Sequence, residues 1–252
     1  MRGLYMAEGA MLNQQAKLEI SGNNLANQRT PGFKKDEKVQ TSFAEWLIVQ
    51  TGREAPMGRN AMVPLGSMAH NVAIDEDFTH LTQGSLEPTG RELDLALEGE
   101  GFFEVDVDGE AHYTRNGHFF LDEEGVLVDA ESNPVQGTEG PITLGMESFE
   151  VTSEGEIYVG EELVDELELV NFDPEANLTK VGDSYLVPED PEEEGFAAEV
   201  SVWQSFLEES NVDLTEEITN LIKSRQSYEG AQQAMLTYDS ILERAANDLG
   251  VL

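Results

Sequence analysis

Carboxylates are the most numerous side chains in this chain that could do chemistry, with 51 acidic residues among 252. Glycoside hydrolysis needs two carboxylates at a defined separation, one of them with a raised pKa. The acidic residues here are so numerous that many pairs could be proposed, and no pair lies in a distinctive apolar stretch of the sequence. Glu98, Glu100 and Glu104, around the sequence GEGFFEV, alternate as exposed strand residues would. A soluble carboxylate hydrolase is therefore kept only as an alternative function.

Histidines and short motifs give no stronger chemical signal. His112 and His118 flank Asn116-Gly117, a dipeptide typical of tight hairpin turns, so a shared metal site is conceivable. Two histidines on a sheet surface are the expected arrangement. The chain has no Cys, which excludes disulfides, thiolate chemistry and Cys-ligated metals. GEGFF lacks the strand-to-helix context of a phosphate-binding loop, and no GxSxG, HExxH, P-loop or calcium-loop pattern occurs. We therefore expect no catalytic residue, no metal ligand, no cofactor and no small-molecule substrate.

The first element with a strong pattern is an expected helix from residue 3 to about 27. Apolar residues recur along it at every seventh position: Leu4, Met11, Leu18 and Leu25. Ala7, Gln14 and Ser21 fall between them, so the spacings alternate between three and four, as in the narrow seam of a coiled coil. About three heptads alone are marginal in water. This helix therefore needs partners.

The stretch SGNNLANQRTPGFK, at residues 21–34, ends this helix. Asn27 can cap the helix, and Pro31 cannot continue it. Gly32 frees the backbone, and Phe33 offers an apolar anchor. We expect a fixed turn between the helix and the rest of the chain.

A second long helix is expected over residues 212–249. One heptad line is strict: Leu214, Leu221, Tyr228, Met235, Leu242 and Leu249. The second line is mixed, because Ile218 and Ala246 are apolar whereas Arg225, Gln232 and Asp239 are polar. Asp213, with Glu216 three residues later, forms an acidic variant of a capping box. A helix packed only on its own domain is the alternative to a coiled coil.

Between the helices, residues 33–83 are expected to form an irregular connector with one short helix or strand, because Pro and Gly interrupt it. Residues 84–206 contain many short alternating stretches separated by turns, including Asp108-Gly109 and Asn116-Gly117. The fold class is therefore α+β, with paired terminal helices and a mainly antiparallel β-domain built as a sandwich or open barrel. The expected domains are residues 1–32, 33–83, 84–206 and 207–252.

Charge separates the same segments. Residues 1–35 carry a net charge of +3, residues 211–252 carry −4, and the remainder carries −36. An acidic field of this size disfavours nucleic acid and anionic membrane surfaces as partners. The sequence has no apolar signal core and no run long enough to span a membrane, and these rules alone would predict a cytoplasmic protein. Two nearly balanced helices beside an acidic middle favour a multi-helix assembly that stacks into a filament.

Five separate motifs resemble the bacterial flagellar rod and hook proteins. They are MRGLY at the start, NNLANQRTPGFK at 23–34, QGSLEPTGRELDLALEGEGFFEV at 83–105, YTRNGHFFLDEEGVLVD at 113–129 and SNVDLTEEITNLIKSRQSYE at 210–229. LTKVGDSYLVP at 178–188 also agrees. The likeness covers nearly the whole chain in family order, and the chain lacks the large insertions of many hook proteins. A rod protein is therefore expected, with a hook-like axial subunit as the alternative.

This resemblance implies an axial structural subunit of the flagellar basal body that self-assembles and transmits torque. Its implied partners are other copies of the chain, neighbouring rod and hook proteins, and the flagellar export apparatus. The resemblance implies that this apparatus exports the subunit from the cytoplasm without cleavage of a signal peptide. The resemblance replaces the cytoplasmic prediction with the basal body. It assigns interface residues to two motifs: Asn23, Asn24, Leu25, Ala26, Asn27, Thr30, Pro31, Gly32 and Phe33, then Ser210, Asn211, Val212, Tyr228 and Glu229. Arg91-Glu92 and Gln28-Arg29 depart from the family pattern. A secreted acidic adhesin-like module is a further alternative, but it gives the heptad helices no purpose.

Overall fold

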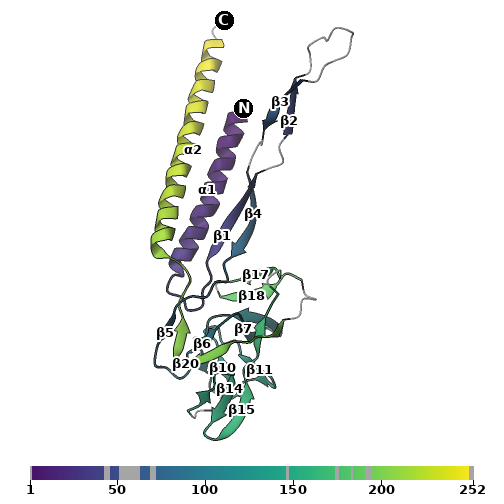
Figure 1. Cartoon of the computed structure of the whole chain (residues 1–252). Coiled ribbons are helices and arrows are strands. Elements are labelled where there is room, and N and C mark those ends of the chain that lie inside the picture. Colours follow the sequence, from purple (N-terminus) through teal and green to yellow (C-terminus); the bar gives the residue numbers. More distant parts are fainter. Residues whose placement is uncertain are drawn as a thin grey trace. The chain divides into compact units, whose positions relative to one another are not determined.

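The computed structural model describes residues 2–42, 46–50, 63–68, 72–145, 148–173, 176–182, 184–190 and 195–249. Its description extends to the side chains except at residues 2–5, 39–77, 245–246 and 248–249. In chain order, a β-rich middle lies between two helices, α1 (Arg2–Ala26) and α2 (Leu214–Leu249) (Figure 1). The fold is therefore α+β, with a central antiparallel β region, as predicted.

The chain divides into two compact units. The helical unit comprises Met1–Asn23, Glu37–Phe78 and Thr215–Leu252, and the β unit comprises Asn24–Asp36 and Thr79–Leu214. Neither described helix is both long enough and apolar enough to cross a membrane.

A β ribbon occupies much of the segment that we expected to be an irregular connector. Its described residues form β1 (Asp36–Ser42), β2 (Trp46–Gln50), β3 (Val63–Met68) and β4 (Val72–Thr79). β1 pairs with β4, and β2 pairs antiparallel with β3. Pro64 and Gly66 do not break the second pair because the register shifts there, so the strand accommodates them as an irregularity of the ladder.

The β unit contains seventeen described strands, most of them short. They are β5 (Leu86–Pro88), β6 (Leu95–Glu98), β7 (Phe102–Val107), β8 (Glu110–Thr114), β9 (Phe120–Leu121), β10 (Leu127–Val128), β11 (Gln136–Gly137), β12 (Gly140–Pro141), β13 (Glu150–Val151), β14 (Glu156–Val159), β15 (Glu162–Glu166), β16 (Leu169–Asn171), β17 (Leu178–Val181), β18 (Tyr185–Pro188), β19 (Phe196–Ala197), β20 (Ser201–Gln204) and β21 (Phe206–Glu208). One sheet has six strands, in the order β17-β18-β8-β7-β16-β19. The other sheets have two or three strands, such as β20-β6 and β21-β5. The described strands thus form one larger sheet and several small ones, and the packing of these sheets as a sandwich or open barrel stays a prediction.

The two predicted hairpin turns have different outcomes. Asp108 and Gly109 join β7 to β8 and both have positive φ angles, 55° and 89°, so this hairpin is confirmed. Asn116-Gly117 does not join a hairpin, because β8 pairs with β7 and β18 while β9 pairs with β10. Gly117 is needed instead for a close approach: a Cβ there would lie 1.7 Å from the backbone oxygen of Leu95.

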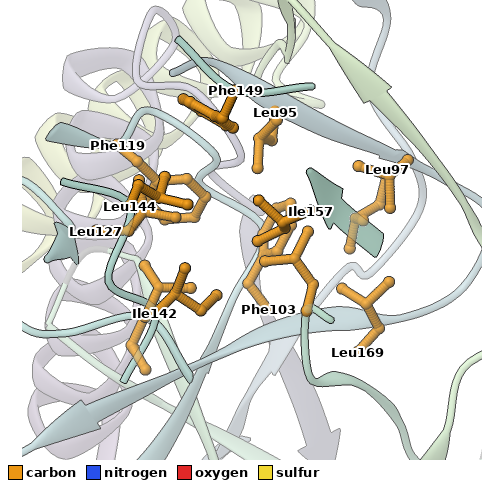
Figure 2. Close-up of a cluster of buried hydrophobic side chains, with 14 of the residues drawn as sticks. Leu95, Leu97, Phe103, Phe119, Leu127, Ile142, Leu144, Phe149, Ile157 and Leu169 are labelled. Carbon is orange, nitrogen blue, oxygen red and sulfur yellow. The ribbon is translucent and has the colours of Figure 1, made fainter. Parts of the chain in front are cut away.

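Apolar side chains cover both faces of the six-stranded sheet. Phe103 packs edge-on against Phe119, with ring centroids 5.2 Å apart, in the main core of the β unit (Figure 2). The adjacent Phe102 points to the other face, where it packs with Phe172 and Leu186. Adjacent residues of a strand point to opposite faces, so β7 is buried on both sides. Asp94 and Ala96 are buried as completely as their neighbours Leu95 and Leu97, so this part of the chain does not alternate between buried and exposed side chains.

Candidate functional site

Helix α1 ends at Ala26 because the next residues form a turn with its own hydrogen bonds. The backbone N–H of Thr30 donates to the carbonyl of Asn27 at 3.1 Å, and the Thr30 hydroxyl donates to Oδ1 of Asn27 at 3.0 Å. Pro31 follows, and it has no N–H with which to extend the helix. The predicted end of the helix is therefore confirmed to within one residue.

Gly32 occupies a position that no larger residue fits. Its φ angle is +67°, and a Cβ would lie 2.3 to 2.4 Å from backbone atoms of Arg115 and Asn116. Its N–H donates to the carbonyl of Glu208 at 2.8 Å. The turn therefore packs backbone against backbone.

Phe33 is the anchor that the sequence suggested. Its side chain is completely buried, and Nζ of Lys180 lies 3.6 Å from the centre of its ring. The same ammonium group donates to the carbonyl of Lys34 at 2.8 Å and to Oδ2 of Asp36 at 3.0 Å. A cation over an aromatic face is attractive, and more so away from water. Phe33 is thus fixed by both apolar and electrostatic contacts.

A buried ion cluster lies directly beside this anchor. Glu208 is 1% exposed, and its Oε1 accepts hydrogen bonds from Nζ of Lys34 at 2.5 Å and from the N–H of Gly84 at 2.8 Å. Its Oε2 lies 3.3 Å from Nη1 of Arg115. Lys34 also donates to the carbonyl of Thr82. One carboxylate therefore serves two buried cations from distant parts of the chain.

Burial sets the protonation chemistry of this cluster. It lowers the pKa of Lys34, an effect that the nearby Glu208 carboxylate opposes and the Arg115 guanidinium reinforces. Burial lowers the pKa of Arg115 in the same way, and this guanidinium remains charged. Removing one partner of such a cluster would leave a buried charge uncompensated.

Asparagines and an aspartate hold together the places where the chain enters and leaves the β unit. The amide of Asn24 donates to the carbonyl of Asp36 at 2.8 Å and accepts from its N–H at 3.0 Å. The hydroxyl of Thr79 donates to Oδ1 of Asp36 at 2.7 Å. Asn211 accepts from the N–H of Lys35 at 2.8 Å, and its amide donates to the carbonyl of His80 at 2.8 Å.

These contacts define a junction clamp, formed by Asn24, Asp36, Thr79 and Asn211. The chain passes between the two units at four places, after residues 23, 36, 78 and 214. Each place lies within three residues of a clamp member. The clamp therefore fixes all four chain ends of the β unit with respect to one another.

The predicted seam of α1 follows its less exposed face. Six seam residues are buried or half-buried: Ala7, Met11, Gln14, Leu18, Ser21 and Leu25. Met6 and Leu12, outside the seam, are 48% and 57% exposed. The side chain of Leu4 lies outside the described residues, and Asn23 is exposed.

In α2 the less exposed face agrees with one predicted heptad line and not with the other. Leu221, Tyr228 and Met235 are half-buried. The second line of this face consists of Glu217, Ser224 and Ala231, one residue before the line that we expected. Ile218, Arg225, Gln232 and Asp239 of the expected line are all exposed. Leu214 and Leu242 are 44% and 49% exposed, and the side chain of Leu249 lies outside the described residues.

The histidines considered as a metal pair contact different groups. His118 Nδ1 lies 2.8 Å from Oδ1 of the buried Asp94, whereas His112 packs edge-on against Tyr185. No group of three His, Asp or Glu side chains in the described part of the chain could hold a metal ion. Glu104 is half-buried, and burial together with the charges of Glu168 and Asp106 raises its pKa.

Sequence reasoning missed the ion cluster and two members of the clamp. Lys34 ends a motif that we quoted, but its partner Glu208 is one of 51 acidic residues, and nothing in the local sequence marks it as buried. One feature of the sequence could have indicated the ion cluster, namely the scarcity of basic residues around it. Within the β unit only six residues are basic, and Lys34, Arg115 and Lys180 are three of them.

Three family models match successive parts of the chain. Residues 4–34 match the flagella basal body rod protein model, and residues 96–159 match the flagellar hook protein FlgE/F/G D1 domain. Residues 204–249 match the flagellar basal body rod FlgEFG protein C-terminal model.

Curated relatives match over almost the full chain. The flagellar basal-body rod protein FlgG of Bacillus subtilis is 31% identical, covering 98% of each chain. The flagellar basal-body rod protein FlgF of Mesorhizobium japonicum is 30% identical, covering 98% of this chain and 97% of the relative. The flagellar hook-basal body complex protein FlhO of Bacillus subtilis is 28% identical, covering 99% of both.

Proposed function

Because the chain belongs to the flagellar basal-body rod protein family and is a structural subunit of the flagellar basal body, we propose that it self-assembles through α1 and α2. In this proposal the two helices pair as a coiled-coil layer and contact the helices of neighbouring subunits. The partners are other copies of the chain and neighbouring rod and hook proteins, and the subunit reaches them through the flagellar export apparatus. Its role is structural rather than catalytic, and it transmits torque for motility.

The observation that carries this proposal is the apolar surface that α2 exposes. Six large apolar side chains on this helix are between 42% and 56% exposed: Leu214, Ile218, Ile222, Leu236, Ile241 and Leu242. Ile218, Ile222, Leu236 and Ile241 lie outside the heptad line of Leu221, Tyr228 and Met235, whereas Leu214 and Leu242 extend that line toward the helix ends. A helix that is apolar on more than one face needs more than one neighbour. Contacts between subunits would supply the additional neighbours.

The distribution of charge between the two units also supports assembly through the helices. The helical unit holds 8 basic and 14 acidic residues, for a net charge of −6, whereas the β unit holds 6 and 37, for −31. Copies that meet through their β units would repel each other strongly, and copies that meet through their helical units would not. The helical unit is therefore the better surface for self-assembly, and the β unit remains solvated.

The interface residues divide between two roles in this proposal. Met11, Leu18, Leu25, Leu221, Tyr228 and Met235, with Leu4, Leu214, Leu242 and Leu249 at the helix ends, form the assembly seam. Gly32, Phe33 and Asn211 act differently, since they are held inside the β unit by Glu208, Lys180 and Lys35. They fix the base from which the helices extend and do not themselves contact a neighbour.

Two pairs of charge-matched variants test the proposal. Ile222→Glu and Leu236→Glu each place a carboxylate on the exposed apolar surface, and Gln226→Glu and Gln233→Glu place the same charge at exposed polar positions of the same helix. All four proteins should fold as the parent does, judged by circular dichroism. The first pair should be lost from purified basal bodies and should reduce motility, whereas the second pair should be incorporated. Normal incorporation of the first pair would refute assembly through this surface.

The match of residues 96–159 to a model that includes hook proteins favours one alternative, a hook-like axial subunit. Immunogold labelling of isolated hook–basal bodies separates the two positions. Label confined to the rod supports the proposal, and label along the hook supports the alternative.

A further inference from the structure

The small sheet formed by β20 and β6 has one face in the core of the β unit and one face on its surface. Leu95, Leu97 and Val202 of these strands belong to the main core (Figure 2). Because side chains alternate along a strand, the residues between them point the opposite way. Trp203 lies opposite Ala96 on this outer face, and it is 44% exposed. The outer face therefore carries a large aromatic side chain that a partner can reach.

Trp203 and Phe206 form an aromatic platform that the backbone holds in place. Their rings meet edge to face, with centroids 5.4 Å apart. Ser205, between them, has a φ angle of +65°, and its carbonyl accepts hydrogen bonds from the N–H groups of Thr89 at 2.9 Å and Gly90 at 3.3 Å. A non-glycine residue in this left-handed conformation costs energy, and such residues concentrate at binding sites. The hydrogen bonds from the neighbouring segment fix this conformation, so the platform is preformed.

A carboxylate is fixed at the edge of the aromatic platform. The indole Nε1 of Trp203 donates to Oε2 of Glu98 at 2.9 Å. This neutral donor does not cancel the charge of Glu98, and no basic side chain in the described part of the chain pairs with that carboxylate. Arg91, in the segment before β6, pairs instead with Asp94 at 3.4 Å. The platform therefore presents an aromatic face beside an uncompensated negative charge.

We propose that the aromatic platform binds a basic segment of a protein partner, with an arginine side chain of that segment over the Trp203 indole and paired with Glu98. Tryptophan is the aromatic side chain that attracts a cation most strongly. The planar guanidinium of arginine both stacks on an aromatic face and hydrogen-bonds a carboxylate. Tryptophan and arginine are also enriched among the residues that contribute most to protein–protein binding.

The charge of the β unit selects this class of partner. With a net charge of −31, the β unit attracts basic surfaces and repels acidic ones. A second copy of the chain is a poor occupant, because its β unit carries the same charge and its helical unit carries −6. The platform therefore serves a contact with a different protein, and this contact does not depend on self-assembly through the helices.

Titration of the full chain with a capped peptide of alternating arginine and glycine tests this proposal, with the tryptophan indole N–H signals followed by NMR. The chain has two tryptophans, so Trp203→Phe assigns the signal of each. The Trp203 signal should shift and saturate, because its N–H donates to the carboxylate that the peptide engages. The signal of Trp46, which belongs to the helical unit, should change far less. A peptide of alternating glutamate and glycine should shift neither signal.

Matched variants separate the platform from the general attraction of a basic peptide to an acidic protein. Trp203→Leu should weaken peptide binding by about 5- to 30-fold, the range for a cation on an aromatic face. Phe196→Leu, at another exposed aromatic position of the β unit, should leave binding unchanged. Glu98→Gln should weaken binding more than Glu162→Gln, which removes the same charge at an exposed position of β15. This second pair decides the question if Trp203→Leu does not fold.

Three results would overturn the proposal. Peptide binding without a shift of the Trp203 signal, or equal weakening by the two Glu→Gln variants, would show general charge attraction only. A Trp203 signal that shifts with protein concentration in the absence of peptide would show that a second copy occupies the platform. A shift caused by the neutral oligosaccharide chitotriose, and not by the arginine peptide, would show that the platform binds a sugar.

Discussion

Glu208→Gln tests whether the buried ion cluster holds the β unit together. Glutamine has nearly the shape of glutamate, so the substitution leaves no cavity. It removes the negative charge that faces Lys34 at 2.5 Å and Arg115 at 3.3 Å. It also replaces one acceptor oxygen with an amide donor, which must then face a cation or the N–H of Gly84. Two cations that are almost completely buried would lose their shared counter-charge.

The expected loss of stability follows from this geometry. Removing one partner of a buried ion pair typically costs about 3–5 kcal/mol, because the remaining charge stays buried without compensation. Glu208 has two such partners and is 1% exposed, which places the cost toward the upper end of that range. For a chain of this size each kcal/mol lowers the melting temperature by about 2–4 °C. Glu208→Gln should therefore lower it by roughly 8–20 °C.

The pH dependence of the loss identifies its cause. Burial lowers the pKa of Lys34 below its ordinary value of 10.5, so between the lowered pKa and 10.5 the unfolded chain binds more protons than the folded chain. Folding stability gained from this group therefore rises with pH through that window. In Glu208→Gln the counter-charge that supports the Lys34 ammonium is absent, so the window extends to lower pH. Part of the lost stability should return as the solution is made alkaline.

Urea unfolding followed by tryptophan fluorescence, repeated across the alkaline range, measures both effects. Glu209→Gln is the matched control, because it makes the same change at the neighbouring exposed residue and should alter stability by less than about 0.5 kcal/mol. A loss below about 1 kcal/mol in Glu208→Gln would show that the cluster contributes little. A loss that stays constant as pH rises would show that the uncompensated charge on Lys34 is not its cause.

Four further substitutions or conditions have expected outcomes. Gly32→Ala should lower the free energy of unfolding by about 2–4 kcal/mol in urea titrations, because its φ is +67° and the Cβ would meet the immobile backbone of Arg115. Asn24→Ala should cost about 2–3 kcal/mol in the same assay, since both backbone polar groups of Asp36 lose their partner. Glu104→Gln should raise the melting temperature at neutral pH, where the raised pKa of Glu104 reports an unfavourable charge; the gain should vanish as acid protonates the parent carboxyl. The melting temperature of the parent should rise with added salt, because its net charge of −37 repels itself less when screened; a value independent of salt would contradict this.

The helices and their junction could be predicted because local rules determine them. The heptad lines of residues 4–25 and 214–249 need a helical backbone, and Pro31 ends the first one by chemistry alone. Gly32 and Phe33 were expected to free the backbone and to anchor the turn, and the structure gives Gly32 a positive φ and buries Phe33 completely. The second heptad line of α2 was misplaced by one residue. Glu217, Ser224 and Ala231 are polar or small, so hydropathy alone did not distinguish them from the exposed line.

The rest depends on contacts between distant residues. Asn116-Gly117 has the composition of a hairpin turn, but the glycine serves the close approach of Leu95, twenty-two residues earlier in the chain. The partner of Lys34 is Glu208, one of 51 acidic residues. Nothing in the sequence around Glu208 indicates that its carboxylate is buried. The β ribbon of residues 36–79 was missed because Pro64 and Gly66 normally break strands, and only the pairing register accommodates them.

The junction clamp has a mechanical consequence for a subunit that transmits torque. The chain crosses between the two units at four places, after residues 23, 36, 78 and 214, and each covalent crossing can carry load. If those crossings could move independently, the load would fall on one of them at a time and the backbone there would act as a hinge. Asn24, Asp36, Thr79 and Asn211 join the four ends by hydrogen bonds, and the Lys34–Glu208 pair fixes them to the β unit. The load is then shared among four crossings. If assembly uses the exposed face of α2, as we propose, weakening the clamp should impair torque transmission before it impairs assembly.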